Sequence, residues 1–201
     1  GTGALAEAID FGPADYHARL DVLVLKHRDP DPPACRRLEF AANGVAMRTV
    51  AGLAARPRFL VAGRLAPTKR LETILAAFAV ARRAFPDAQL HVVGNAEPRH
   101  ADYARGLLAS APEGVRWRGP DFDLGYLAEP WTAAVVLGVH QGCPNAVLEA
   151  FSAGVAVIAN ASGGTGELVA DGVTGWLLAE DCSAGELAQA LLDAAGDGEA
   201  C

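Results

Sequence analysis

A site for a polar ligand is indicated first by residues 141–149, whose sequence is Gln-Gly-Cys-Pro-Asn-Ala-Val-Leu-Glu. Pro144 follows small residues and opens an apolar segment, which is the pattern of a helix start. Asn145 and Glu149 are four residues apart, so their side chains lie on the same face of that helix. Unpaired backbone N–H groups at a helix start favour an anion. This stretch therefore predicts a pocket for a ligand with hydroxyl and phosphate groups.

A second candidate is the loop Gly63–Lys69, which lies between an expected strand and an expected helix. Gly63 permits a tight turn, Arg64 supplies a forked cation, and Lys69 supplies a compact positive charge near the helix start. Two cations at the end of a parallel strand suit a diphosphate. The alternative is a solvated loop whose charges bind nothing.

Two weaker candidates lie nearby. His140 and Cys143 suggest a catalytic pair or a metal site, but no third ligand or orienting acid has a useful spacing, so we expect no metal. The glycine-rich residues 163–166 lack the full spacing of a dinucleotide loop. They predict a turn before a short helix, with N–H groups available to an anion.

The elements that must position these loops follow from the hydrophobic pattern. Short apolar runs predict buried strands, and apolar residues every three or four positions predict amphipathic helices. Their alternation predicts an α/β fold, a Rossmann-like parallel sheet with helices on both faces. The expected strands are Asp21–Leu25, Arg58–Ala62, Gln89–Val93, Ala134–Val139 and Val155–Ala159, and the expected helices are Arg70–Ala84, Ala101–Ala111, Ala146–Ala153 and Ala184–Ala195.

In such sheets ligands bind beyond the carboxyl ends of the strands, where loops lead into helices. Four loops therefore carry the expected site: Gly63–Lys69, Gly94–His100, His140–Asn145 and Asn160–Gly166. The turn pair Asn43-Gly44 indicates a domain boundary nearby. We predict that residues 1–42 are a linker or the remnant of a preceding domain, and that residues 43–201 form the main domain.

Composition excludes several classes of function. The net charge of −7 argues against general nucleic-acid binding, and no apolar run reaches the roughly 18 residues of a membrane span. The four cysteines contain no C-x-x-C pair, so neither a disulfide framework nor a zinc site is expected. No signal peptide is recognisable at the first residues, so we expect a cytoplasmic protein. Fifteen arginines against two lysines suggest a bacterial source of high GC content.

Motifs in a fixed order from about Glu39 to Leu192 resemble the carboxyl-terminal, donor-binding domain of GT-B-fold glycosyltransferases, specifically the retaining enzymes of family 4. The resemblance covers three-quarters of the chain. It implies a domain that binds a nucleotide-sugar donor without metal or other cofactor. The matching motifs are Asn43-Gly44-Val45, Gly63-Arg64-Leu65-x-Pro67-x-Lys69, Val92-Val93-Gly94, Pro144-Asn145-Ala146-Val147-Leu148-Glu149-Ala150, Gly154-Val155-Ala156-Val157, Gly163-Gly164-Thr165-x-Glu167 and Asp171-Gly172-x-Thr174-Gly175.

The resemblance also implies roles for the matching residues. Arg64 and Lys69 would clamp the donor diphosphate and stabilise the charge that builds on the leaving nucleotide. Glu149 is similar to the second glutamate of the family's E-x7-E element, which binds the ribose. The remaining donor-binding positions are Gly142, Cys143, Pro144 and Asn145 for the sugar, Gly94, Asn95, Arg118 and Gly119 for the base, Thr165 for the phosphates, and also Gly63 and His140.

One residue departs from the family pattern. The first glutamate of the E-x7-E element, which faces the donor sugar and the reaction centre, is Gln141 here. An amide can accept or donate a hydrogen bond but carries no charge. We expect Gln141 to orient a sugar hydroxyl and transfer to survive. Full-length enzyme with Gln141→Ala should therefore lose rate or donor selectivity.

Several alternatives stay open. A sugar-nucleotide epimerase is another GT-B relative, whereas a phosphorylase would need a lysine for pyridoxal, and of Lys26 and Lys69 the second already has a role. A non-catalytic nucleotide-sensing module is the alternative outside enzymes. Because acceptors bind mainly to the amino-terminal domain, we expect this chain to be a fragment that is inactive without that domain. Any contact with a membrane surface is likewise expected through the missing half.

Overall fold

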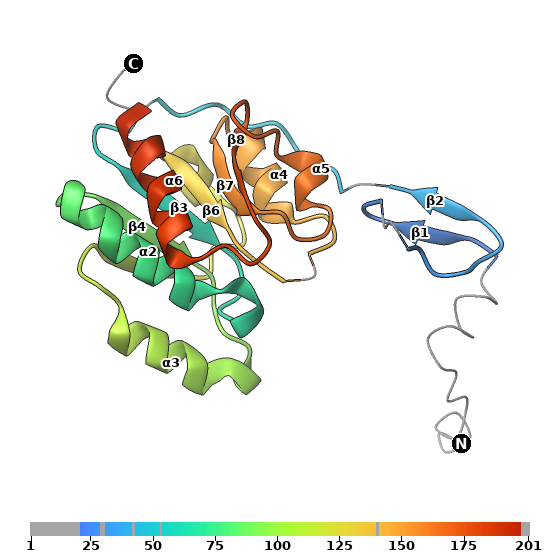
Figure 1. Ribbon diagram of the computed structural model, residues 1–201, viewed down its shortest axis with the longest axis horizontal. Helices are drawn as coiled ribbons and strands as arrows, with labels where there is room; N and C mark the ends of the chain where they lie inside the picture. The colour runs from blue at the N-terminus through green and yellow to red at the C-terminus, as the bar shows by residue number, and fades with distance from the viewer. Residues whose placement is uncertain (1–20, 29–30, 42, 53, 140, 198–201) are drawn as a thin grey trace. The chain divides into compact units, whose positions relative to one another are not determined.

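The computed structural model describes residues 21–28, 31–41, 43–52, 54–139 and 141–197 (Figure 1). These residues belong to two compact units that are joined between Asn43 and Gly44. The first unit contains two short parallel strands, β1 (Leu23–Leu25) and β2 (Leu38–Phe40), with Leu23 opposite Leu38. β1 was expected, and β2 was not. The interpretation of this unit as a remnant of another domain stays a prediction.

The second unit is built on one parallel sheet with the strand order β5-β4-β3-β6-β7-β8. The chain moves outward from β3 to β5 on one side, then returns to the centre and moves outward from β6 to β8 on the other. This is the strand order of a Rossmann domain, so the predicted fold class is confirmed. The strands are β3 (Arg58–Ala62), β4 (Gln89–Val93), β5 (Val115–Gly119), β6 (Ala133–Val136), β7 (Val157–Asn160) and β8 (Gly175–Leu178).

Helices and short turns connect these strands. The helix α4 begins at Asn145, one residue earlier than expected, and α6 continues two residues beyond Ala195. The helices are α2 (Leu71–Ala84), α3 (Ala101–Ser110), α4 (Asn145–Ser152), α5 (Thr165–Leu168) and α6 (Ala184–Asp197), and the 3-10 turns are η1 (Pro67–Lys69), η2 (Pro98–His100) and η3 (Gly125–Ala128).

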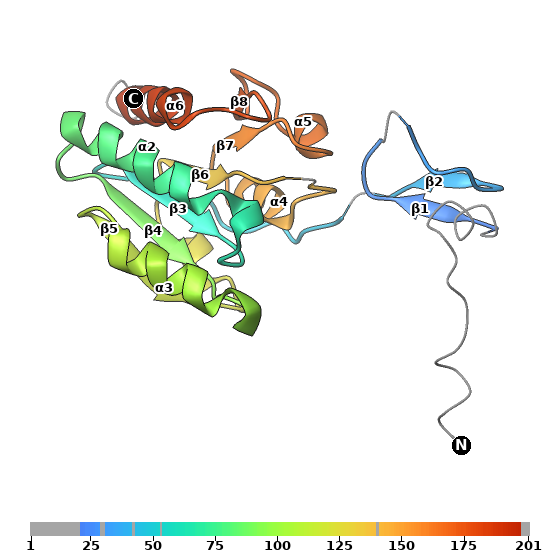
Figure 2. The same cartoon turned by 60° about the horizontal axis from the view of Figure 1, so that its bottom comes forward.

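Two hydrophobic cores cover the two faces of this sheet. Alternate residues of a strand point to opposite faces, so Phe59 and Val61 of β3 pack into one core and Leu60 into the other. The first core includes buried residues of α2, α3 and α6, and Figures 1 and 2 show α2 and α6 side by side. The second core includes residues of η3 and α4. Both faces are therefore covered, which leaves the ends of the strands as the open edges.

Candidate functional site

The centre of the site lies at the carboxyl ends of β3 and β6, the neighbouring strands from which the chain departs in opposite directions. Open α/β sheets bind ligands at this switch point. Here the Nζ atom of Lys69, at the end of η1, donates a hydrogen bond of 2.7 Å to the Oε1 atom of Gln141. The two residues are 72 positions apart in the chain. The structure thus brings together two of the three predicted catalytic side chains.

Lys69 is a half-buried cation with an uncharged partner. Burial, followed by the positive charge of Arg64, lowers the pKa of its ammonium group. Both effects disfavour the charged form, whereas a neutral amide compensates a charge less than a carboxylate would. An anion bound beside Lys69 and Arg64 would relieve both penalties. The electrostatics of the site therefore favour a negatively charged ligand.

Arg64 lies on the same loop but is exposed, and its Nη1 atom is 2.5 Å from the Oε1 atom of Glu97. Glu97 precedes η2 in the loop after β4, and its other oxygen is 2.7 Å from Arg99. The paired guanidinium groups lower the pKa of the Glu97 carboxyl. An exposed pair of this kind contributes little stability, so Arg64 can exchange it for a ligand phosphate. Sequence patterns gave no indication of Glu97, because its partner is 33 residues away.

The loops after β3, β4 and β5 lie in contact through their backbones. The N–H of Gly63 donates to the carbonyl of Val93, and the N–H of Gly94 donates to the carbonyl of Gly119 at 2.8 Å. The carbonyl of Asn95 accepts the N–H of Leu65 at 2.9 Å. Three of the residues predicted for the base, together with Gly63, are therefore neighbours at one edge of the sheet.

The predicted sugar-binding loop leads from β6 into α4. Cys143 and Pro144 are buried, Gly142 is half-buried, and Asn145 is exposed at the first turn of the helix. The buried residues Cys143 and Pro144 therefore hold the loop in place just before the first backbone N–H groups of α4. His140 lies outside the described residues, and its predicted role stays untested.

Glu149 is half-buried on the second turn of α4. The hydroxyl of Tyr126, in η3, donates to its Oε2 atom over a long 3.4 Å. Burial, then the charge of Glu149, raises the pKa of Tyr126, so its hydroxyl stays a donor at neutral pH. A carboxylate with such a weak partner keeps capacity for ligand hydroxyl groups. Tyr126 was not predicted from the sequence.

Thr165 begins α5 and is fully buried, unlike a residue open to a phosphate. Its Oγ1 atom and the Nε2 atom of Gln141 are buried without a hydrogen-bond partner among the described residues. The neighbouring Gly164 donates its N–H to the carbonyl of Gln141 at 3.0 Å. In this structure the Gly164 N–H therefore supports the backbone of Gln141, whereas the predicted phosphate contact of Thr165 stays a prediction.

The side chain of Arg118 forms an ion pair with Glu129 and does not point to the Lys69 loop. Its Nη1 atom is 2.6 Å from Glu129, whose other oxygen is 2.7 Å from Arg58. Arg58 begins β3, so this network lies toward the opposite end of that strand from Gly63. The guanidinium of Arg58 also lies 4.5 Å above the ring of Trp131. The structure does not bring the Arg118 side chain to Lys69.

His91 belongs to the same network and predicts a pH dependence of stability. Its ring packs edge-on against Trp131, and burial, then Arg58 and Arg118, lowers its pKa to about 4. The unfolded chain has the ordinary pKa of about 6.5 and so binds the proton more readily. The free energy of unfolding is therefore highest above about pH 6.5 and decreases as pH falls, by about 1–2 kcal/mol between pH 7 and 5. Urea unfolding at both pH values would measure this, and His91→Gln should remove that share of the loss. An equal loss in the variant would contradict the assignment.

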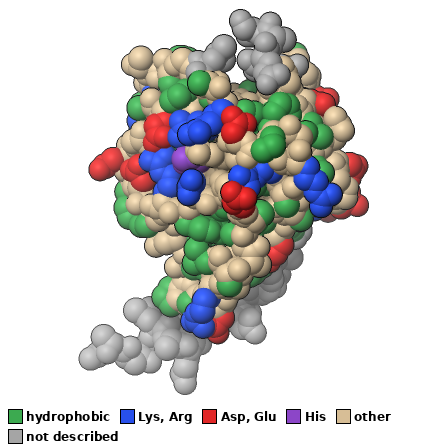
Figure 3. Space-filling model, turned by 90° about the vertical axis from the view of Figure 1, so that its left-hand side faces the viewer, with side chains coloured by type: hydrophobic (Ala, Val, Ile, Leu, Met, Phe, Trp, Pro, Cys, Tyr) green, Lys and Arg blue, Asp and Glu red, His purple; other side chains and the backbone are tan. Residues whose placement is uncertain are grey.

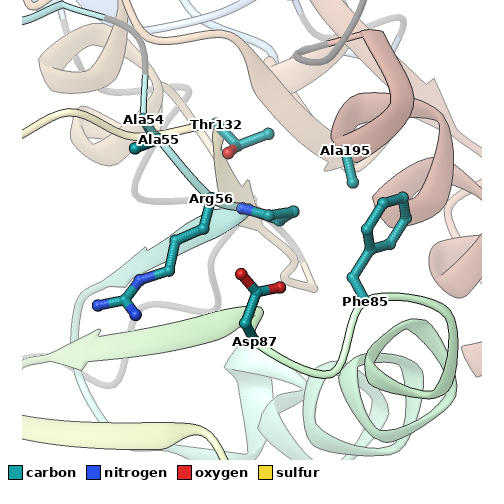
Figure 4. Close-up of a pocket in the computed structure, with 8 residues that line it drawn as sticks. Ala54, Ala55, Arg56, Phe85, Asp87, Thr132 and Ala195 are labelled. Carbon is teal, nitrogen blue, oxygen red and sulfur yellow. The ribbon is translucent and has the colours of Figure 1, made fainter.

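The edge of the sheet at the amino ends of the strands carries charges of both signs and a small hollow. Figure 3 shows basic and acidic side chains interspersed over the end of the molecule where α2 finishes. A small hollow there has Phe85 and Ala195 on one side and Arg56 on the other, with Asp87 between them (Figure 4). It lies at the edge that open α/β sheets do not use for ligands. The full lining is Ala54, Ala55, Arg56, Pro57, Phe85, Asp87, Thr132 and Ala195.

Within the part of the chain that the structure describes, no three His, Cys, Asp or Glu side chains are placed to hold a metal ion. Over the same residues, no helix is long and apolar enough to cross a membrane.

The strand order defines a Rossmann-like domain, with two cations, Arg64 and Lys69, in the loop at its switch point. The chain belongs to the family described as glycosyl transferases group 1, whose sequence model matches residues 56–197. It is 30% identical over 150 residues to the lipopolysaccharide 1,2-N-acetylglucosaminetransferase of Salmonella typhimurium, which covers 70% of this chain and 39% of that protein. It is 29% identical over 93 residues to the Vi polysaccharide biosynthesis protein VipC/TviE of Salmonella typhi, covering 46% of this chain and 16% of that protein.

Solved structures show the same fold. The sucrose-phosphate synthase of Thermosynechococcus elongatus superimposes with a TM-score of 0.77 at 22% identity, over 92% of this chain and 52% of that chain. Anabaena HepE in complex with UDP and glucose gives a TM-score of 0.69 at 20% identity, over 81% of this chain and 48% of that chain. The chain spans less than half the length of the curated relatives that it matches.

Proposed function

We propose that this domain binds the nucleotide-sugar donor of a retaining, metal-independent hexosyltransferase of family 4, as the carboxyl-terminal half of a GT-B enzyme. The observation that supports this most is the Lys69–Gln141 hydrogen bond at the switch point, with Arg64 on the same loop. Family membership and a relative solved with UDP and glucose support the nucleotide sugar. A bacterial source fits the Salmonella relatives, and a cytoplasmic location stays a prediction.

In the proposed complex the diphosphate lies against Lys69 and Arg64. As the bond between the anomeric carbon and the diphosphate breaks, negative charge builds on the leaving oxygen, and two fixed cations stabilise it. The burial of Lys69 strengthens this contribution, because charges interact more strongly away from water. Residues Gly142–Asn145 line the donor sugar, and backbone N–H groups of this stretch, in which Pro144 has none, lie near its hydroxyl groups. The base lies beside Gly94, Asn95 and Gly119.

The acceptor and the complete reaction belong to the larger protein. The relatives are at least about twice the length of the matched region. We infer that transfer needs the amino-terminal domain of the same enzyme, and that the present chain binds donor but transfers little sugar. Rapid transfer by the chain alone would contradict this inference.

Glu149 provides the test of the ribose site. After calorimetric titration with UDP, GDP and ADP identifies the nucleotide, its 2′-deoxy form should bind about tenfold more weakly, because it loses a hydrogen bond to a carboxylate. Glu149→Gln should remove most of that preference for the ribose. The matched control is Glu72→Gln, since Glu72 is an α2 carboxylate that also accepts a tyrosine hydroxyl, from Tyr103. A preference that persists in Glu149→Gln would place the ribose elsewhere.

One observation favours a second candidate, a nucleotide-sensing module without catalysis. The neutral Gln141 occupies the position of a family carboxylate, and its Oε1 atom is already engaged by Lys69. Such a module would bind nucleotide without turnover even in the full-length enzyme. Full-length protein that binds donor but neither transfers nor hydrolyses it would favour this candidate.

A further inference from the structure

Asn160 ends β7, and its side chain is fully buried beside the site. Its Oδ1 atom accepts the N–H of Gly138 at 2.9 Å, and its Nδ2 atom donates to the carbonyl of the same glycine at 2.8 Å. The Nδ2 atom also donates to the carbonyl of Glu180 at 2.7 Å. The acceptor and both donor hydrogens of the amide are thus used, which fixes one arrangement of the side chain.

Through Gly138, Asn160 reaches Gln141 and the turn that carries Lys69. A Cβ atom on Gly138 would lie 2.3 Å from the Nε2 atom of Gln141, so the Gln141 amide packs directly on the Gly138 backbone. The next residue, Val139, donates its N–H to the carbonyl of Thr68 at 3.0 Å. Thr68 immediately precedes Lys69. Holding Gly138 at both its N–H and its carbonyl therefore holds both ends of the Lys69–Gln141 hydrogen bond.

Through Glu180, Asn160 reaches the same turn from the other side. The Nη1 atom of Arg70 donates to the carbonyl of Glu180 at 2.8 Å, and its Nη2 atom donates to the carbonyl of Cys182. Arg70 immediately follows Lys69 and has a left-handed backbone, with a φ of 50°. Arg70, after Lys69, thus shares the Glu180 carbonyl with Asn160. Thr68, before Lys69, is bonded to Val139, the neighbour of the Gly138 that Asn160 binds.

We propose that Asn160 is a positioning residue that sets the relative placement of Lys69 and Gln141 for the donor diphosphate and sugar. The effect of this placement on donor binding and transfer rests on the proposed function, whereas the position of Lys69 and Gln141 in the free chain does not. The side-chain hydrogen bonds of Asn160 go to the backbones of Gly138 and Glu180, so we infer that it acts through these two residues. Both polar atoms of the buried Asn160 amide are hydrogen-bonded. A buried amide that is satisfied in this way is stiff, which suits cations that must be fixed before the reaction begins.

Asn160→Asp tests the proposal with the smallest change of shape. It keeps an acceptor for the Gly138 N–H but sets a carboxylate oxygen against the carbonyls of Gly138 and Glu180. We expect the loops to separate and Lys69 to become more accessible. Arg70→Gln removes the contacts with Glu180 and Cys182 from the other side, and it serves if the first variant does not fold. Thr132→Val is the control, since Thr132 accepts the Arg58 N–H at the far ends of the strands.

The accessibility of Lys69 can be measured directly because Lys26 is the only other lysine. Trace labelling of the folded chain with acetic anhydride, followed by mass spectrometry, gives the ratio of Lys69 to Lys26 modification without any ligand. We expect Asn160→Asp and Arg70→Gln to raise this ratio at least threefold, and Thr132→Val to leave it unchanged at equal loss of Tm. An unchanged ratio in the folded Asn160 and Arg70 variants, or an equal rise in the control, would overturn the proposal.

Calorimetry on the same proteins separates the proposal from the proposed function. If UDP, GDP or ADP binds the unchanged chain, Asn160→Asp should weaken that binding about tenfold, and an affinity equal to that of the control would overturn the positioning role. If none of the three binds, the proposed function fails, whereas the labelling ratio still decides whether Asn160 places Lys69.

Discussion

Replacement of Lys69 with alanine is expected to weaken nucleoside diphosphate binding roughly 10- to 150-fold. The half-buried ammonium would make a charge-assisted hydrogen bond to a phosphate oxygen, and such bonds contribute about 1.5–3 kcal/mol. The Gln141 amide cannot replace it, because in this structure its oxygen faces Lys69. Calorimetry with the nucleotide that binds the unchanged chain measures the effect. Lys26→Ala removes the only other lysine and should leave the affinity unchanged.

Lys69→Ala should also change the pH dependence of diphosphate binding. Burial and Arg64 lower the pKa of Lys69, so its charge is lost at a lower pH than that of an ordinary lysine. Diphosphate affinity should therefore decline as pH rises through this lowered pKa. In Lys69→Ala the decline should be absent. Affinity within twofold of the unchanged chain, or an identical pH profile, would show that the diphosphate does not contact Lys69.

The central strands were predictable because buried strands consist of short apolar runs that are visible in the sequence. β3 and β4 have the bounds expected from Arg58–Ala62 and Gln89–Val93. The edge strands were not predicted. β5 alternates half-buried residues with exposed Arg116 and Arg118, and no run of apolar residues forms. β6 ends at Val136 instead of Val139, since the apolar pattern continues into the loop that Asn160 holds.

The site was predictable only to the level of its loops. A parallel sheet collects the carboxyl ends of its strands at one edge, so the loops of Arg64 and Gln141 were expected at the same edge. Which atoms meet depends on loop conformations that no local pattern encodes. The contacts of Lys69 with Gln141 and of Asn160 with Glu180 join residues 72 and 20 positions apart. The burial of Thr165 likewise depends on tertiary packing that no local pattern encodes.

Gly163→Ala is expected to have a large effect on stability. Gly163 has a φ of +56°, and an added Cβ would lie 1.7 Å from the carbonyl oxygen of Gln141. The loop cannot relax without moving that carbonyl, which also accepts the N–H of Gly164. Backbone strain and the displaced contact should together reduce the free energy of unfolding by roughly 3 kcal/mol. Urea unfolding would measure the reduction.

Gly172→Ala is the matched control for this substitution. Gly172 has a similar φ of +70°, but a Cβ there would meet nothing within 4 Å. It should therefore show backbone strain alone, about 1 kcal/mol. Because movement of the Gln141 carbonyl also carries its amide away from Lys69, Gly163→Ala should weaken nucleoside diphosphate binding at temperatures where it is folded, and Gly172→Ala should not. Equal losses of stability and affinity in the two variants would mean that the backbone of Gln141 does not depend on the close approach of Gly163.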